Sequence, residues 1–253
     1  MTKTTITQSS TTPITSADQT ANHGVAITVA AIALVLAVAG GREVYGALAA
    51  QSGRAALETA LALPRGADRD NALHKAQSDL TAAAGVASAD PVIWLALAET
   101  RYLQAVGGAA QGVSVELAHA AAAAAGRAAA LAPQDPKPPA LMAQALAAAG
   151  EHPEAIAPPL AASYALDAEN EDLAPWRPAT AFQAWTALPR PAQDAALMEA
   201  CFYGRETAER FSVLESQAAV AADPDLATRL GALLTDAACQ PAPVRFGDVP
   251  PPS

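Results

Sequence analysis

Aromatic residues are scarce in this sequence, and so are the residue patterns of β-strands. Of its 253 residues, 52% are hydrophobic but only 4% are aromatic, and the excess is alanine. Alanine has the highest helix propensity of the amino acids. β-branched residues are sparse outside one apolar run, and no segment alternates apolar and polar residues over the length of a strand. The sequence therefore predicts an all-α protein.

Basic residues are also few. The sequence has 15 Lys and Arg against 25 Asp and Glu, which gives a formal net charge of −10. Nucleic acids and anionic lipid headgroups are bound by clustered Lys and Arg. The charge therefore argues against nucleic acid and anionic headgroups as partners.

Catalytic and metal-binding motifs are missing as well. The sequence contains no P-loop, no G-x-G-x-x-G and no G-x-S-x-G. The four histidines lie on different segments, and none has a second His or Cys at helical spacing. They are His23, His74, His119 and His152. We therefore expect no catalytic residue, no cofactor and no metal, and we do not expect an enzyme.

One acidic cluster, Glu169, Glu171 and Asp172, has two interpretations. Paired carboxylates can act as an acid and a base or bind calcium. The dipole of a solvated helix start favours the same residue types. We prefer the second interpretation, because no other feature of the sequence accompanies the cluster.

What the sequence does contain is one long apolar run, residues 24–41, which has no charged side chain and one hydroxyl. Its length is near the lower limit of roughly 17–25 residues for a membrane-spanning helix. We interpret it as a signal anchor. A cleaved signal peptide is the alternative, since Ala37-Val38-Ala39 before Gly40 has the small-x-small form. A buried helix of a soluble protein is the third interpretation.

This run divides the chain. Residues 1–23 form a polar tail that we expect to be disordered. Residues 42–69 are a juxtamembrane helix and linker, residues 70–239 are the helical domain, and residues 240–253, with five prolines, are a second disordered tail. The basic residues that flank the run are nearly balanced, so they do not set its orientation. Both targeting interpretations export the chain beyond residue 41. As a signal anchor, the run makes the chain a single-pass protein of the inner (plasma) membrane, with a domain that is periplasmic in a Gram-negative bacterium.

Helix caps and breakers predict the helices of the domain. Asp90 and Asp223 each precede a proline, as N-cap residues do. The first predicted helix places Leu73, Ala76, Leu80 and Ala83 on one face. The predicted helices cover about 70–86, 92–106, 114–131, 139–149, 151–166, a segment with Phe182 and Trp185, 192–203, 206–221 and 224–238.

Consecutive helices of this domain resemble the tetratricopeptide repeat, a unit of two antiparallel helices. Trp94-x-x-Leu97-Ala98 follows the opening of that motif, and Pro133 to Asp167 spans one period. The resemblance implies helix-packing roles for Trp94, Leu97, Ala98, Pro133, Met142, Ala143, Leu146, Gly150, Ala155 and Ala162. An irregular α-bundle is the alternative, because small residues at helix crossings occur there too.

Two prolines depart from the repeat pattern. Pro158 and Pro159 fall inside the helix predicted for residues 151–166. Proline inside a helix removes a hydrogen bond and clashes with the preceding turn, which costs about 3 kcal/mol. The helix therefore either begins again at Pro158 or kinks there.

The carboxyl half contains S-Y-A-L-D, P-W-R, A-F-x-x-W and Q-D-A-A-L-M-E-A. Through these segments it resembles small membrane-anchored helical-repeat proteins associated with bacterial surface-polysaccharide genes. Trp176, Arg177 and Trp185 form either an aromatic shelf for a sugar or cation, or part of the core. We prefer the core.

The only two cysteines are Cys201 and Cys239. If the domain is exported, it enters an oxidising compartment where a disulfide persists. The alternative is a small buried Cys201 and an incidental thiol at Cys239.

The resemblance to the repeat family implies a non-catalytic function. Together with the predicted anchor it indicates a membrane-anchored scaffold for protein–protein interaction in the bacterial cell envelope, with a protein partner held on the stacked helix pairs. The alternative is a structural accessory subunit of an envelope-polysaccharide or cell-wall assembly. An enzyme is the third class, and no constellation of residues favours it.

Overall fold

The computed structural model describes residues 40–107, 112–206, 209–210, 212–213, 216 and 223–239. The chain divides into two compact units, Met1–Tyr45 and Gly46–Ser253. The predicted tails and residues 24–39 of the predicted anchor lie outside the described residues, as does most of the helix predicted for 206–221. None of the described helices combines the length and the apolar character needed to cross a bilayer.

The described residues are helical and contain no strand, which confirms the all-α prediction. In the second unit the first described helix occupies residues 46–62. The next helices along the chain are α2 (Ala67–Val86), α3 (Pro91–Gly107), α4 (Val115–Leu131), α5 (Lys137–Ala148), α6 (Pro153–Leu166), α7 (Arg177–Gln183), the 3-10 helix η1 (Trp185–Ala187), α8 (Arg190–Gly204) and α10 (Pro224–Thr235).

The two predicted cap residues each begin a helix. The Asp90 carboxylate accepts a hydrogen bond from the Val92 N–H (2.9 Å), and the Asp223 carboxylate accepts one from the Leu226 N–H (2.9 Å). Each satisfies a donor that the first helical turn leaves without a partner. Between α5 and α6 the chain turns at Gly150, whose φ of 79° is readily adopted only by glycine.

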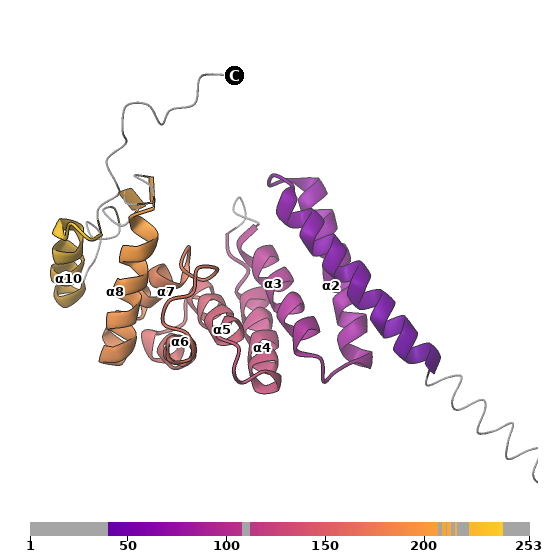
Figure 1. The fold of residues 1–253 in the computed structure, drawn as a ribbon. Coiled ribbons are helices and arrows are strands. Elements are labelled where there is room, and N and C mark those ends of the chain that lie inside the picture. The colour runs from indigo at the N-terminus through magenta and orange to yellow at the C-terminus, as the bar shows by residue number, and fades with distance from the viewer. Residues whose placement is uncertain are drawn as a thin grey trace, which may run out of the picture. The chain divides into compact units, whose positions relative to one another are not determined.

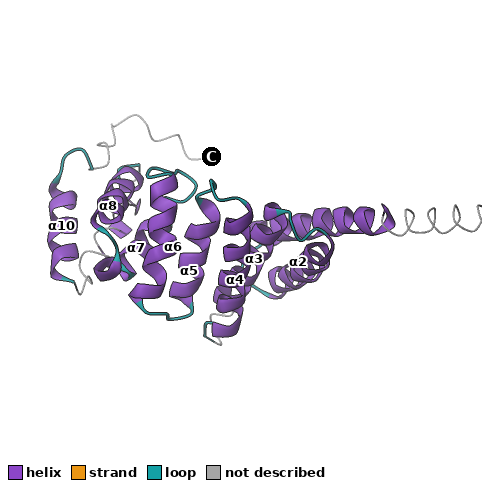
Figure 2. Ribbon diagram, turned by 90° about the horizontal axis from the view of Figure 1, so that it is seen from below, coloured by secondary structure: helices purple, strands orange, loops and turns teal. Residues whose placement is uncertain are grey.

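Helices α2 to α6 lie side by side in chain order, each packed on the next (Figures 1 and 2). The helix of residues 46–62 joins the same core through Leu57 and Ala60, which pack with Leu73 and Leu80 of α2. The compact core therefore begins before residue 70, inside the segment that the sequence indicated as juxtamembrane helix and linker.

Helix α6 runs through both internal prolines without beginning again at Pro158. Its buried face consists of Ile156, Ala157, Leu160, Ser163 and Tyr164.

The packing role expected for Ala155 and Ala162 is wrong, because both side chains are exposed. Successive residues of a helix differ by about 100° in direction. The structure buries Ile156 and Ser163 instead, one residue further along the chain, so the predicted register of α6 was displaced by one position.

The remaining predicted packing positions fall into three groups. Leu97, Ala98 and Ala143 are fully buried. Trp94, Met142 and Leu146 are partly buried and pack against the core. Pro133 and Gly150 are exposed in turns.

The repeat resemblance implied a helix-packing role for Trp94, and the structure places its side chain at the edge of the core, only partly buried. Its ring N–H donates a hydrogen bond to the Ser88 carbonyl (2.9 Å). The indole therefore spans the turn between α2 and α3, and its polar edge is satisfied by the backbone of that turn.

Candidate functional site

A cleft of about 410 Å³ runs across alternate helices of the second unit. The described residues that line it come from the helix of residues 46–62, from α3, from α5 and from the turn before α7, and none comes from α2, α4 or α6. They are Leu61, Glu99, Tyr102, Leu103, Lys137, Leu141, Gln144, Asp172 and Trp176.

The cleft is apolar, with a few polar groups at defined places. Lys137 of α5 pairs with Glu99 of α3, with 2.7 Å between Nζ and Oε1. Burial raises the pKa of the Tyr102 hydroxyl further above neutral pH. A concave, mainly apolar surface with few polar groups is the usual form of a ligand site.

A second feature is a charged pair inside the carboxyl half. Arg177, at the start of α7, has no exposed surface, and Glu199 of α8 is 1% exposed. The Arg177 Nε donates to Glu199 Oε2 at 2.9 Å, and Nη2 donates to Oε1. This bidentate arrangement is the strongest geometry for an Arg–carboxylate pair.

The third nitrogen of the Arg177 guanidinium is hydrogen-bonded as well. Nη1 donates to Ser163 Oγ (3.0 Å) and to the Asp167 carbonyl (2.9 Å). The guanidinium carbon lies 4.2 Å from the centre of the Tyr164 ring. Ser163 Oγ in turn donates to the Pro136 carbonyl (2.9 Å), just before α5.

Glu199 receives two further hydrogen bonds. The Tyr164 hydroxyl donates to Oε2 (3.1 Å), and the Asn170 N–H donates to Oε1 (3.3 Å). We call Ser163, Tyr164, Asp167, Asn170, Arg177 and Glu199 the Arg177–Glu199 cluster. It connects the start of α5, α6, the turn at Asn170, α7 and α8 through one buried network.

Protonation inside this cluster is set mainly by burial. Burial raises the pKa of Glu199, and the hydrogen bonds and charge of Arg177 oppose that rise. Burial and then the Glu199 carboxylate hold the pKa of Tyr164 well above its usual value. Tyr164 therefore remains a hydrogen-bond donor. Every polar group of the pair has a partner, which is the arrangement of a structural network.

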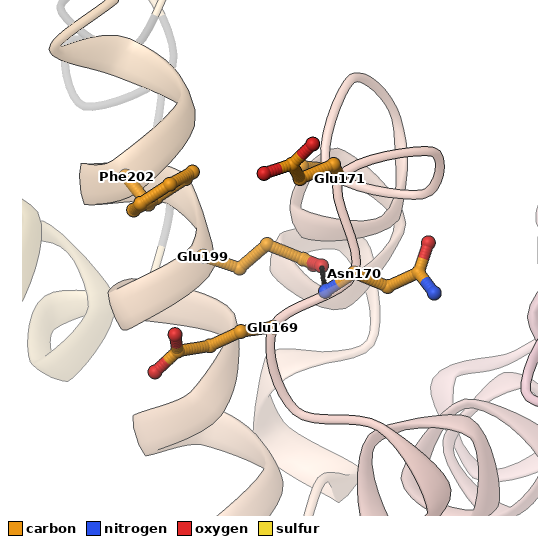
Figure 3. Close-up of a pocket in the computed structure, with 6 residues that line it drawn as sticks. Glu169, Asn170, Glu171, Glu199 and Phe202 are labelled. Carbon is orange, nitrogen blue, oxygen red and sulfur yellow. Dashed lines mark hydrogen bonds between the residues drawn. The ribbon is translucent and has the colours of Figure 1, made fainter.

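A small pocket of about 100 Å³ adjoins the cluster at the acidic turn. Figure 3 shows Glu199 reaching from α8 to the backbone of Asn170, with Glu169, Glu171 and Phe202 around it. Its volume is below the typical range for a ligand pocket, which is about 300–1,000 Å³. Within the described residues no group of three or more His, Cys, Asp or Glu is placed to hold a metal ion.

Three of the four carboxyl-half segments meet in the Arg177–Glu199 cluster. S-Y-A-L-D supplies Ser163, Tyr164 and Asp167, P-W-R supplies Arg177, and Q-D-A-A-L-M-E-A supplies Glu199. Sequence reasoning did not bring them together.

One sequence signal was available for the cluster. Glu199 occupies a core position of α8, whose other buried residues include Ala192, Ala195, Ala196 and Ala200. A carboxylate on a core face needs a buried cationic partner. Arg177 is the residue that meets this need.

The aromatic-shelf interpretation of Trp176, Arg177 and Trp185 is wrong. Trp185 is buried in a small core with Leu197, Leu226 and Leu230, and its ring N–H donates to Asp225 (3.2 Å). Arg177 is buried in the ion pair, and Trp176 lines the cleft. The three side chains therefore have three separate roles.

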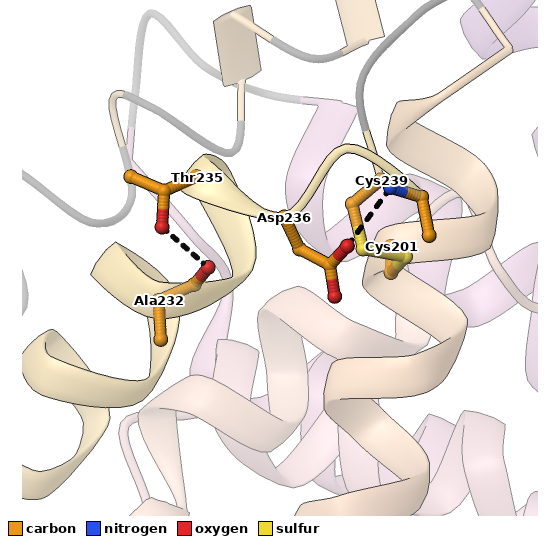
Figure 4. The surroundings of a disulfide bond; sticks show 6 residues. Cys201, Ala232, Thr235, Asp236 and Cys239 are labelled. Carbon is orange, nitrogen blue, oxygen red and sulfur yellow. Dashed lines mark hydrogen bonds between the residues drawn. A yellow bond between two sulfur atoms is a disulfide. The ribbon is translucent and has the colours of Figure 1, made fainter.

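Cys201 and Cys239 form a disulfide in the structure, the pairing that the sequence left open. Figure 4 shows the bond between α8 and the turn after α10, where the Cys239 N–H donates to the Asp236 carbonyl (3.0 Å). The bond ties the segment after α10 to the helix that carries Glu199.

Comparison of the sequence and structure with protein-family models, curated proteins and solved structures gives no match. The cleft and the sequence alone therefore carry the inference of function.

Proposed function

We propose that this chain is a membrane-anchored, non-catalytic scaffold for protein–protein interaction in the bacterial cell envelope. The observation that carries the proposal is the cleft lined by the helix of residues 46–62, α3, α5 and the turn before α7. Alternate helices that share one groove give a continuous surface on which a partner segment can lie. The resemblance of Trp94-x-x-Leu97-Ala98 to the tetratricopeptide repeat supports the same function.

The cellular setting rests on two features. The apolar composition of residues 24–41 supports an anchor in the inner (plasma) membrane. The disulfide between Cys201 and Cys239 supports an oxidising compartment for the helical domain, such as the periplasm.

A second candidate function is that of a structural accessory subunit in an envelope-polysaccharide or cell-wall assembly. The observation that favours it is that three segments resembling such proteins form the Arg177–Glu199 cluster. In this second function the helical domain is a rigid body that binds no partner in its cleft. The partners contact the anchor, residues 24–41, instead.

Site-specific photo-crosslinking in intact cells distinguishes the two functions. A photoreactive amino acid at Leu61 or Gln144, which both line the cleft, should form an adduct with a protein partner. The same group at Ala162, exposed on α6, should form none. Equal adducts at all three positions, or none at the cleft, would contradict the scaffold. Adducts only from residues 24–41 would favour the accessory subunit.

A further inference from the structure

We infer that the partner segment held by the cleft presents a basic side chain to Asp172, next to apolar side chains that cover Leu61, Leu103 and Trp176. This inference rests on the proposed function and specifies the chemistry of the partner. It makes the cleft selective for cationic, amphipathic peptide segments.

The charge of the cleft is negative once its internal pair is considered. The ammonium of Lys137 already neutralises Glu99 at 2.7 Å. Asp172 is exposed, its backbone N–H is bound by the Asn170 side chain, and its carboxylate makes no ion pair with any residue that the structure describes. One uncompensated carboxylate therefore remains at the edge of the cleft.

The whole chain reinforces this local charge. Its net charge of −10 attracts cationic segments and repels anionic ones over distances of about a Debye length, which is ~8 Å at physiological salt. An acidic partner would have to approach against this field and leave Asp172 facing a like charge.

The apolar part of the cleft determines which other side chains the partner segment needs and how large the segment can be. Leu61 is 58% exposed although it is a large apolar residue, and the aromatic rings of Tyr102 and Trp176 line the same cleft. Aromatic faces accept both aliphatic side chains and guanidinium groups. The volume of about 410 Å³ accommodates a few side chains of a short segment and is too small for a folded domain.

The test is a selection from a random peptide library displayed on phage, with the detergent-purified full-length protein as bait. Peptides that combine Arg or Lys with neighbouring apolar residues should be enriched. Asp172→Asn should raise the Kd of the best peptide about two- to fivefold, the effect of one exposed ion pair, and added salt should reduce the difference. Asp172→Lys should favour the same peptide with Glu in place of its basic residue.

The controls separate charge from shape. Glu171→Gln removes a neighbouring carboxylate that lies outside the cleft lining, and it should leave the Kd unchanged. Gln144→Trp fills the cleft and should abolish binding, with its melting temperature as a check that it folds. Selection of acidic peptides, or equal Kd values for Asp172→Asn and wild type, would overturn the charge inference while the proposed function stands. If every selected peptide binds Gln144→Trp as tightly as wild type, both the charge inference and the proposed function are wrong.

Discussion

Arg177 is among the largest side chains that are fully buried in the described residues, and its burial is possible only because each of its three guanidinium nitrogens has a hydrogen-bond partner. Moving an unpaired guanidinium out of water costs several kcal/mol. The bidentate contact with Glu199, the Ser163 hydroxyl and the Asp167 carbonyl replace its hydration shell. The pair therefore fixes how α6, α7 and α8 sit together rather than supplying a large net stabilisation.

Glu199→Gln should destabilise the protein by about 3–5 kcal/mol, because it leaves the Arg177 charge buried without its counterion. The midpoint of chemical denaturation measures this loss. Glu169→Gln is the matched control, since Glu169 is exposed in the adjoining turn, and its effect should stay within about 0.5 kcal/mol. An unchanged midpoint for Glu199→Gln would show that the pair is not buried in solution.

At the scale of the helix, local signals in the sequence were sufficient to predict where helices begin. Asp90 and Asp223 each begin a helix where their cap chemistry predicted one. The one-residue register error in α6 arose because small residues there are distributed around the helix, so the repeat pattern did not distinguish the face of Ala155 from that of Ile156. The partner of Glu199 was not predictable from local signals, since it lies 22 residues away on another helix.

The close contact between the helix of residues 46–62 and α2 depends on Gly53. A Cβ at that position would lie 2.7 Å from Leu80 Cγ and 3.1 Å from the Leu80 backbone nitrogen. Gly53→Ala should therefore separate the two helices and cost about 1–3 kcal/mol. Gly85→Ala in α2 is the control, because a Cβ there meets nothing within 4 Å and should stabilise by about 0.5–1 kcal/mol. Thermal denaturation of both variants measures the contrast, and a stabilised Gly53→Ala would rule out this contact.

A polar contact between the same two helices should make stability depend on pH. Asp79 of α2 accepts hydrogen bonds from Lys75 Nζ (2.6 Å) and from Ser52 Oγ (2.7 Å), and these bonds lower the pKa of its carboxyl group. Because the folded pKa lies below the unfolded value, which is about 3.9, the stabilisation is complete above that pH and is lost as the pH falls through the folded pKa. Wild type should exceed Asp79→Asn in unfolding free energy at pH 7, and the difference should close in acid. A constant difference at all pH values would contradict this assignment.

Across the second unit, the cleft and the disulfide lie in different parts of the fold. The cleft is formed by the helix of residues 46–62, α3, α5 and the turn before α7, whereas the disulfide joins α8 to the turn after α10. Helix α10 contributes only Leu226 and Leu230 as buried residues to the small core around Trp185. A helix with so little apolar burial depends on other attachments, which here include the disulfide, the ion pair of Arg229 with Asp194 and the hydrogen bond from Trp185 to Asp225.

Reduction of the Cys201–Cys239 disulfide should therefore release α10 before the rest of the unit. The bond closes a loop with a sequence separation of 38, and the loop-entropy model assigns about 3–4 kcal/mol to such a closure. Hydrogen exchange should become faster at the amides of α10 on reduction and stay unchanged at those of α4. The double variant Cys201→Ser with Cys239→Ser should exchange like the reduced protein and should not respond to reductant. Equal exchange at α10 in the oxidised and reduced protein would mean that its other contacts hold it. Two thiols freely alkylated in the unreduced protein from its native compartment would mean that the bond does not form there, which would also remove its support for an oxidising environment.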